Sequence, residues 1–175
     1  MESANSSRIV GSYVTLIDQQ APDFEFESTA GSTVRLSETL ADGPSIVIAF
    51  RGTWCSYCAE QLQTFSALEY DMWRHLNVDV LPVAGASVSA LRTMRDRFDL
   101  SLQLLSDPDL ELAEAYTGVE DNDAHGEILV PGTFIVDADG VVRYEHVGEN
   151  AADRTYANYT RAAIRDHDCR DPYRE

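Results

Sequence analysis

Two cysteines separated by two residues are the part of this 175-residue sequence best suited to chemistry. Cys55 and Cys58 form a C-x-x-C motif, in which one thiolate can attack a disulfide or a peroxide O–O bond and the second thiol can then close a disulfide with the first. A zinc site is the alternative, but it needs a further Cys or His pair at matching spacing. Near the C-terminus only His167 and Cys169 remain, and they do not repeat that spacing. The motif therefore indicates thiol redox chemistry, with no metal and no organic cofactor.

The position of the motif assigns a role to each cysteine. It directly follows Ser45–Phe50, a short continuous apolar run that is typical of a central strand buried on both faces. From residue 56 to residue 76 the apolar residues recur at helical spacing. Cys55 thus lies at a helix N-terminus, where free N–H groups and the helix dipole favour the thiolate. Cys58 lies one turn further along the same face, so we expect Cys55 to attack and Cys58 to resolve.

The other elements predict one α/β domain around a mixed sheet with helices on both faces. We expect an N-terminal extension over 1–20, the domain over 21–166 and a polar tail over 167–175. The expected elements are a hairpin at Pro22–Leu36, strands at 78–84, 102–105, 133–136 and 141–146, helices at 88–98, 108–116 and 152–166, and a polar, acidic loop at 120–126. In the helix that follows Ser106, Asp107 is the expected N-cap and Pro108 the first helical residue.

A proline lies just before one of these strands. Val130-Pro131 precedes the strand at 133–136, and Pro131 suits either of two conformations. A cis bond would place backbone polar groups beside Cys55 to hold an extended thiol substrate, whereas a trans proline would simply begin the strand.

Four fragments, in the same order along the chain, resemble the alkyl hydroperoxide reductase/thiol-specific antioxidant (AhpC/TSA) group of redoxins. They are APDF at 21–24, the F-x-x-x-W-C-x-x-C pattern of FRGTWCSYC at 50–58, LSDPD at 105–109 with Ala115-Tyr116, and PGTFIVD at 131–137 with Gly140 and Arg143. The resemblance covers most of residues 20–165. It implies a thioredoxin-like fold, a central mixed β-sheet flanked by helices with an N-terminal β-hairpin. It also implies that Pro131 is the family's cis-proline and shapes, with Trp54 and Val130, a substrate groove.

Departures from the family pattern bear on the substrate. Peroxiredoxins carry P-x-x-x-[T/S]-x-x-C, and here Ile48 and Gly52 stand at the proline and Thr/Ser positions. They also place an activating arginine where this chain has Pro131. Peroxide reduction needs donors that stabilise the leaving oxygen, so these losses favour disulfide exchange. Thioredoxins differ too, because they often have a buried Asp where this chain has Ala49 and Gly-Pro where it has Ser56-Tyr57.

Four further residues are candidates for auxiliary roles. Arg51 or Arg143 could replace the missing arginine, and Glu60, adjacent to the position where related redoxins often carry a glutamate, is a possible proton shuttle. The competing interpretation for all three is an ordinary surface or loop charge. Cys169 is a candidate distant resolving thiol, a function that Cys58 supplies at better geometry.

The charge of the chain excludes several classes of partner. It has 30 acidic residues against 13 basic ones, all arginine, for a net charge of −17. Without a basic patch, we expect no nucleic-acid and no membrane partner. Such a surface resembles that of proteins from salt-accumulating organisms, in which molar salt screens the self-repulsion. Asp121, Asp123 and His125 could bind a cation, but a solvated acidic loop is the simpler interpretation.

The predicted function follows from the motif and the resemblance together. Residues 1–7 lack the apolar segment of a signal peptide and no apolar run is long enough to span a bilayer, so we expect a cytoplasmic protein. We predict a thiol-based antioxidant oxidoreductase that reduces peroxide or protein disulfides and is recycled by a thioredoxin-like or low-molecular-weight thiol reductant. The alternatives are a non-peroxidase thiol–disulfide exchange protein and a redox-sensing binding module.

Overall fold

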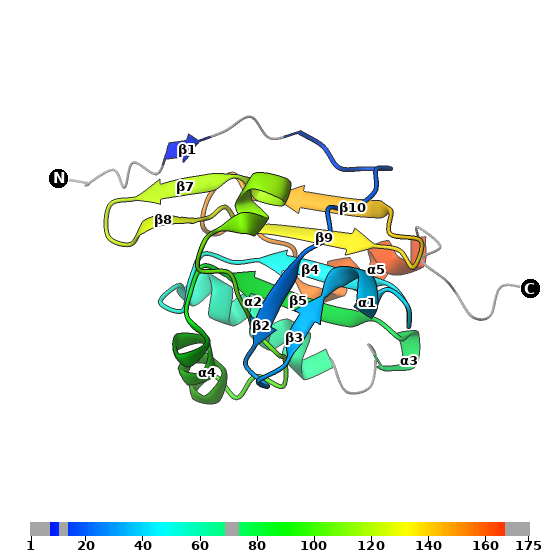
Figure 1. The fold of residues 1–175 in the computed structure, drawn as a ribbon, viewed down its shortest axis with the longest axis horizontal. Coiled ribbons are helices and arrows are strands. Elements are labelled where there is room, and N and C mark those ends of the chain that lie inside the picture. The colour runs from blue at the N-terminus through cyan, green and yellow to red at the C-terminus, as the bar shows by residue number, and fades with distance from the viewer. Residues whose placement is uncertain (1–7, 11–13, 69–73, 167–175) are drawn as a thin grey trace, which may run out of the picture.

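A seven-stranded mixed sheet forms the centre of the protein (Figure 1), in the order β10-β9-β4-β5-β6-β2-β3. The computed structural model describes residues 8–10, 14–68 and 74–166. The strands of this sheet are β2 (Glu25–Ser28), β3 (Thr33–Arg35), β4 (Ser45–Ala49), β5 (Asp79–Ala84), β6 (Leu105–Ser106), β9 (Gly132–Val136) and β10 (Val142–Val147). Strands β4, β5 and β6 pair in parallel, and the remaining pairs are antiparallel. The predicted mixed sheet and the hairpin within Pro22–Leu36 are confirmed.

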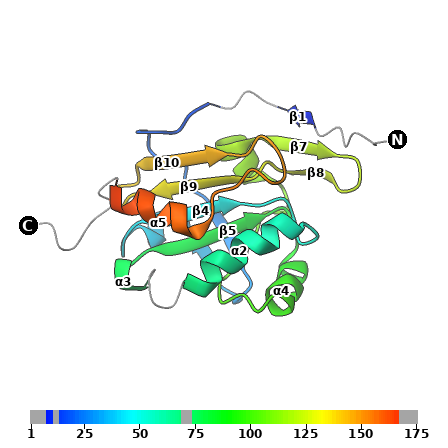
Figure 2. The same cartoon turned by 180° about the vertical axis from the view of Figure 1, so that it is seen from behind.

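Strand β4 divides two apolar cores, because successive side chains of a strand point to opposite faces. Ile46 and Ile48 join a core with the helices that Figure 2 shows in front of the sheet, and Val47 and Ala49 join the other core. All four side chains are fully buried. The helices are α1 (Leu36–Thr39), α2 (Ser56–Leu68), α3 (Arg74–Leu76), α4 (Val88–Arg97), α5 (Ala157–Asp166) and the five-residue π-helix η2 (Ala113–Thr117). Of these, α2, α4 and α5 cover the first face, and α1 and η2 contribute to the second.

The segment expected to be a polar loop at 120–126 is instead part of a second sheet. Strands β7 (Val119–Asn122) and β8 (Gly126–Leu129) form a hairpin, and β1 (Arg8–Val10) pairs with β7. The prediction was wrong because the polar residues alternate between the two sides of a strand: Asp121 and Asp123 are exposed, whereas Glu120 and Asn122 are buried. A polar run with a glutamate at a buried position lacks the apolar alternation from which a strand is predicted.

Two helices begin later than predicted. Leu110 has a φ of +55°, so the chain turns after Pro108 and helical residues begin at Glu111. The carboxylate of Asp107 nevertheless caps this helix, because it accepts from the backbone N–H groups of Glu111 and Leu112 at 2.9 Å each. Helix α5 begins at Ala157 and leaves residues 148–156 as a loop over the end of the sheet.

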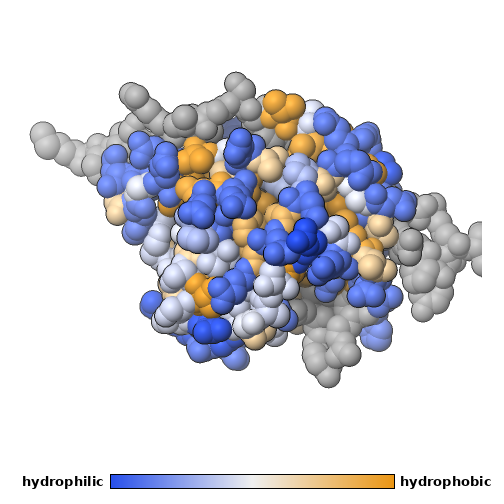
Figure 3. Space-filling model, in the orientation of Figure 1, coloured by the Kyte–Doolittle hydropathy of each residue, from blue (hydrophilic) through white to orange (hydrophobic). Residues whose placement is uncertain are grey.

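The surface agrees with the composition. The face shown in Figure 3 is mostly hydrophilic, with apolar residues in small separate spots. Within the described ranges, no helix is long and apolar enough to cross a bilayer. The predicted tail over 167–175, with His167 and Cys169, lies outside the described residues.

Candidate active site

Cys55 and Cys58 meet at the N-terminus of α2, as the motif predicts. Cys55 directly precedes the helix and its sulfur accepts a hydrogen bond from the backbone N–H of Cys58 at 3.3 Å. The sulfur thus occupies the position of an N-cap acceptor, where the helix dipole stabilises negative charge. Both cysteines are free thiols and both are buried, with Cys55 4% exposed and Cys58 fully buried.

The two thiols differ strongly in acidity. Hydrogen bonding from the Cys58 thiol lowers the pKa of Cys55 to about 6; burial opposes this shift, while the charge of Arg154 and the Cys58 backbone N–H add to it. Burial raises the pKa of Cys58 well above its usual range, and its hydrogen bond to Cys55 raises it further. Near neutral pH the pair therefore holds one thiolate, at Cys55, and one proton, at Cys58. The expected roles, with Cys55 attacking and Cys58 resolving, stay a prediction.

An arginine that sequence analysis did not consider lies against the nucleophile. The guanidinium of Arg154 donates to the Cys55 sulfur, Nη2 to Sγ, at 3.5 Å. Its other nitrogens are held by neutral oxygens: Nε donates to the carbonyl of Ala151 at 2.7 Å and Nη1 to Oε1 of Gln61 at 3.2 Å. Among the described residues, Arg154 makes no ion pair with a carboxylate within 4 Å.

The loop that carries Arg154 is fixed by several polar contacts. Asp153 accepts from His146 at 2.8 Å and from the backbone N–H of Glu149 at 2.9 Å. Gln61, on α2, donates to the carbonyl of Thr155 at 2.8 Å, and the loop begins where the N–H of Gly148 donates to the carbonyl of Pro131. These contacts replace the first turn of the helix that the sequence predicts at residue 152.

Arg51, one of the predicted auxiliary residues, lies in the buried part of the site but is neutralised there. Its guanidinium forms a two-pronged pair with Glu120 on β7, with Nη2–Oε1 at 2.8 Å and Nε–Oε2 at 3.2 Å. Both side chains are 7% exposed. The guanidinium also lies 5.0 Å from the ring centroid of Trp54, and it contributes to lowering the pKa of Cys55.

Trp54 covers the loop before the helix. Its indole stacks on the imidazole of His125, at the tip of the β7–β8 hairpin, with ring centroids 3.6 Å apart and planes 4° apart. The indole also folds back over Gly52, where an added Cβ would meet Nε1 at 2.5 Å. Gly52 stands at the position of the peroxiredoxin Thr/Ser, so in this chain the indole fills the space in which that hydroxyl would lie. Trp54 remains 40% exposed.

Val130 and Pro131 lie at the same end of the sheet as the cysteines. The next residue, Gly132, pairs with Ala49 at the end of β4. The expected cis bond at Pro131 is wrong, because no cis peptide bond occurs among the described residues. The trans form is the lower-energy one, and both residues are already held by the fold: the Val130 N–H donates to Gly118 and the Pro131 carbonyl accepts from Gly148.

The other two predicted auxiliary residues are not brought into the site. Arg143, on β10, is paired with Asp137, in the turn that joins β9 to β10, at 2.7 Å and with Asp18, in the segment before β2, at 3.0 Å. This pairing raises the pKa of Arg143. Glu60 is exposed on α2. Asp121 and Asp123 are exposed on the β7–β8 hairpin, and no group of three potential metal ligands occurs in the described part of the chain.

Comparison with known proteins places this arrangement in a family. The model of the AhpC/TSA family matches residues 17–145. The chain belongs to the AhpC/TSA family. Among curated proteins it is similar to thioredoxin-like protein YneN of Bacillus subtilis, with 28% identity over 74% of this chain and 71% of that protein. It is 24% identical to the thiol-disulfide oxidoreductase ResA of Bacillus thuringiensis, over 79% of this chain and 73% of ResA.

Solved structures support the same fold. Peroxidoxin BcpB of Mycobacterium tuberculosis superimposes with a TM-score of 0.75 at 20% identity, over 87% of this chain and 98% of BcpB. A peroxiredoxin-like protein of Aquifex aeolicus gives 0.75 at 19% identity, over 91% of both chains. This AhpC/TSA protein therefore has the thioredoxin-like fold that the motifs imply, and it is a thiol-dependent oxidoreductase.

Proposed function

We propose that this AhpC/TSA protein catalyses thiol–disulfide exchange, with Cys55 as the nucleophile and Cys58 as the resolving thiol. The observation that carries the proposal is the unequal acidity of two thiols on one helical turn. An attacking thiol works best when its pKa lies near the ambient pH, and a resolving thiol should stay protonated until the mixed disulfide has formed. The curated relatives named as thiol-disulfide oxidoreductases support the same choice.

The proposed reaction consumes one disulfide and yields two thiols. The Cys55 thiolate attacks one sulfur of the substrate disulfide, a new S–S bond forms, and the second substrate sulfur leaves as a thiolate. Cys58 then loses its proton and attacks Cys55, which releases the other substrate sulfur. The substrate is reduced and the Cys55–Cys58 pair is oxidised to a disulfide. A thioredoxin-like or low-molecular-weight thiol reductant would return the pair to the dithiol.

Access to the buried sulfurs favours a substrate that docks on aromatic side chains. Trp54 and Tyr57 flank Cys55 in the sequence and are 40% and 44% exposed. Of the backbone groups predicted to line a groove, the Val130 N–H and the Pro131 carbonyl already have partners within the protein. We therefore assign substrate docking mainly to the two aromatic rings.

Peroxide reduction, the antioxidant activity, is the second candidate, and one observation favours it. The Arg154 guanidinium lies beside the Cys55 sulfur and could donate to the oxygen that leaves when the O–O bond breaks. Against it, the space over Gly52 is filled by the Trp54 indole.

The cytoplasmic location stays a prediction from the sequence.

Stopped-flow oxidation of the reduced protein distinguishes the two substrates. We would replace Cys169 by Ser throughout, so that only the motif thiols react, and follow intrinsic fluorescence because Trp54 lies next to Cys55. Thiol–disulfide exchange predicts rapid oxidation by a peptide disulfide, catalytic reduction of insulin disulfides, and oxidation by hydrogen peroxide no faster than free cysteine. Cys55→Ser is the matched control and should remove every fast phase. Fast oxidation by peroxide with slow reaction toward disulfides would instead establish the peroxidase.

A further inference from the structure

Two arginines approach Cys55, and their polar partners differ by a single charge. Arg51 is paired with the carboxylate of Glu120, whereas Arg154 is held by the amide of Gln61. All of these side chains are at least partly buried, and Arg51, Glu120 and Gln61 are nearly inaccessible. In a buried site each charge acts on its neighbours with little screening by water.

We propose that Glu120 and Gln61 are positioning residues that set the net positive charge beside Cys55 and thereby the reduction potential of the Cys55–Cys58 pair. Glu120 balances the charge of Arg51, and Gln61 orients Arg154 while leaving its charge uncompensated. The proposal rests on the assignment of Cys55 as the redox-active thiolate.

The location of the four side chains supports a common effect on one sulfur. Arg51 is four residues before Cys55 and Glu120 reaches it from β7, so the β7–β8 hairpin supplies the balancing charge. Gln61 projects from α2 and holds both Arg154 and the carbonyl of Thr155, which fixes the guanidinium at 3.5 Å from the sulfur. Other titratable groups that the described residues bring close to this cluster include Cys58 on α2, His125 through its stack on Trp54, and the His146–Asp153 pair that holds the Arg154 loop.

The consequence for the redox equilibrium has a definite sign. Positive charge beside Cys55 stabilises its thiolate, which exists only in the dithiol form, and so makes the pair a stronger oxidant. Removing the carboxylate at 120 should therefore strengthen the oxidant, and adding one at 61 should weaken it. A tenfold change in the dithiol–disulfide equilibrium corresponds to about 30 mV for this two-electron couple.

Two reciprocal amide–carboxylate exchanges test the proposal. In Glu120→Gln we expect the Cys55 pKa, measured by thiolate absorbance against pH, to fall by about one unit. In Gln61→Glu we expect it to rise by about one unit. The reduction potential at pH 8, measured against a glutathione buffer, should become less negative by about 30 mV in the first variant and more negative by a similar amount in the second.

The controls separate electrostatics from damage to the fold. Asp121→Asn removes the same charge from the neighbouring exposed position of β7 and should leave the pKa and potential unchanged. Glu120→Asp keeps the charge, so its Cys55 pKa and reduction potential should be close to those of the wild type. The double variant Gln61→Glu/Glu120→Gln should give values between those of the two single variants. If one of the two exchanges prevents folding, the Cys55 pKa and reduction potential of the other one, compared with those of Glu120→Asp, still give the sign of the charge effect.

Shifts in the same direction for both exchanges, or no shift in either, would contradict the proposal. Both measurements need no substrate, so they are independent of which disulfide or peroxide the protein reduces. A failure of exchange activity with the predicted shifts intact would count against the proposed function only. Normal exchange activity without the predicted shifts would count against the proposed charge balance only.

Discussion

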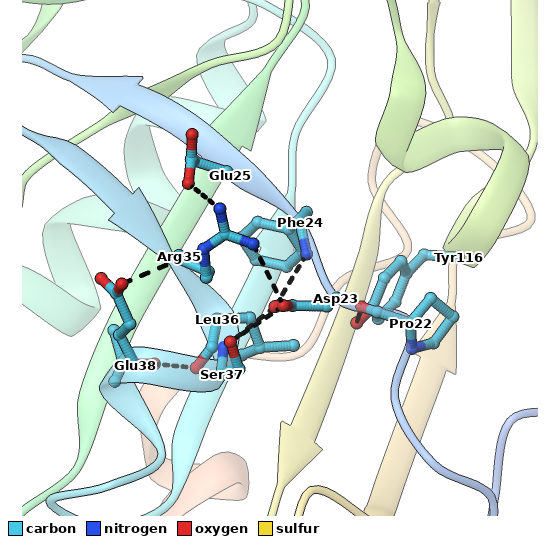
Figure 4. A network of polar contacts seen from close by, with 10 residues as sticks. Pro22, Asp23, Phe24, Glu25, Arg35, Leu36, Ser37, Glu38 and Tyr116 are labelled. Carbon is cyan, nitrogen blue, oxygen red and sulfur yellow. Dashed lines mark hydrogen bonds and ion pairs between the residues drawn. The ribbon is translucent and has the colours of Figure 1, made fainter.

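Arginine meets carboxylates in two different settings, one beyond the end of strand β4 and one at the edge strand β3. At the end that leads to Cys55, Arg51 and Glu120 form one buried pair with both side chains 7% exposed. At the end of β3, Arg35 lies among Asp23, Glu25 and Glu38 at the surface, with its own side chain 44% exposed (Figure 4). The second cluster adjoins β4 through α1, where the Thr39 hydroxyl contacts that of Ser45 at 2.8 Å.

The difference shows how burial changes the effect of the same chemical groups. Around Arg35 the charges are solvated, three carboxylates share one guanidinium, and Asp23 is satisfied in addition by the N–H and hydroxyl of Ser37. Any one of these contacts can be replaced by water at little cost. Around Arg51 water is largely excluded and Arg154 is partly buried, so their charges are less screened and add to the hydrogen bond from Cys58 in lowering the pKa of Cys55.

Removal of the thiols themselves should have the largest effect, because the two thiols carry the reaction. Cys55→Ser should lower the rate of disulfide reduction by about 10³-fold or more, because no nucleophile remains. In the Cys58→Ser variant Cys55 should still attack the substrate disulfide. The reaction should then stop at a stable mixed disulfide, visible by mass spectrometry. A Cys58→Ser variant that turned over at the wild-type rate would show that another thiol resolves the intermediate.

Breaking the buried pair should be the next largest effect. Arg51→Ala leaves the Glu120 carboxylate buried without its guanidinium, and we expect a loss of about 3–5 kcal/mol in the free energy of unfolding, measured by urea denaturation. The double variant Arg51→Met/Glu120→Leu removes both charges and should recover most of this stability. If the single variant lost less than about 1 kcal/mol, the Arg51 site would behave like the surface cluster around Arg35.

Removing the partly buried Arg154 should change the acidity of Cys55 more than the stability of the fold. In wild-type protein the rate of Cys55 alkylation by iodoacetamide should rise with pH around a midpoint of about 6. In Arg154→Ala we expect that midpoint to move up by about one unit, since a neighbouring positive charge that favours the thiolate is lost. Below pH 6 alkylation should then be about tenfold slower. Arg154→Lys should keep much of the effect, and Arg165→Ala, exposed on α5, should show none.

The parts of the site that are local in sequence could be predicted, and the parts built from distant residues could not. Cys55 and Cys58 follow a continuous apolar strand and begin a helix, so their roles come from adjacent residues. Arg154 reaches Cys55 across 99 positions, and Glu120 reaches Arg51 across 69. Nothing in the residues around Arg154 distinguishes it from a surface arginine, because its role depends on where the loop lies.

The errors in the predicted fold have the same origin. The sequence of the hairpin at 119–129 looks like a polar loop, because one of its inward-facing residues is a glutamate. Glu120 is buried through its pair with Arg51, and local sequence patterns do not contain this contact between distant residues. The helix after Asp107 begins late because Leu110 adopts a left-handed conformation that a leucine does not signal. Where the apolar pattern alone decides, as in β4 and β5, prediction and structure agree closely.

The smallest effect should follow disruption of the surface cluster shown in Figure 4. Arg35→Ala removes the shared partner of Asp23, Glu25 and Glu38, and we expect the free energy of unfolding to fall by about 1 kcal/mol or less. Because exposed charges are screened by ions, the difference from wild type should shrink further between dilute and molar salt. The Cys55 alkylation midpoint should not move, since Arg35 lies on the edge strand β3, which three strands separate from β4 in the sheet. A loss as large as that of Arg51→Ala, or a shift in the acidity of Cys55, would mean that the two regions are coupled through the sheet.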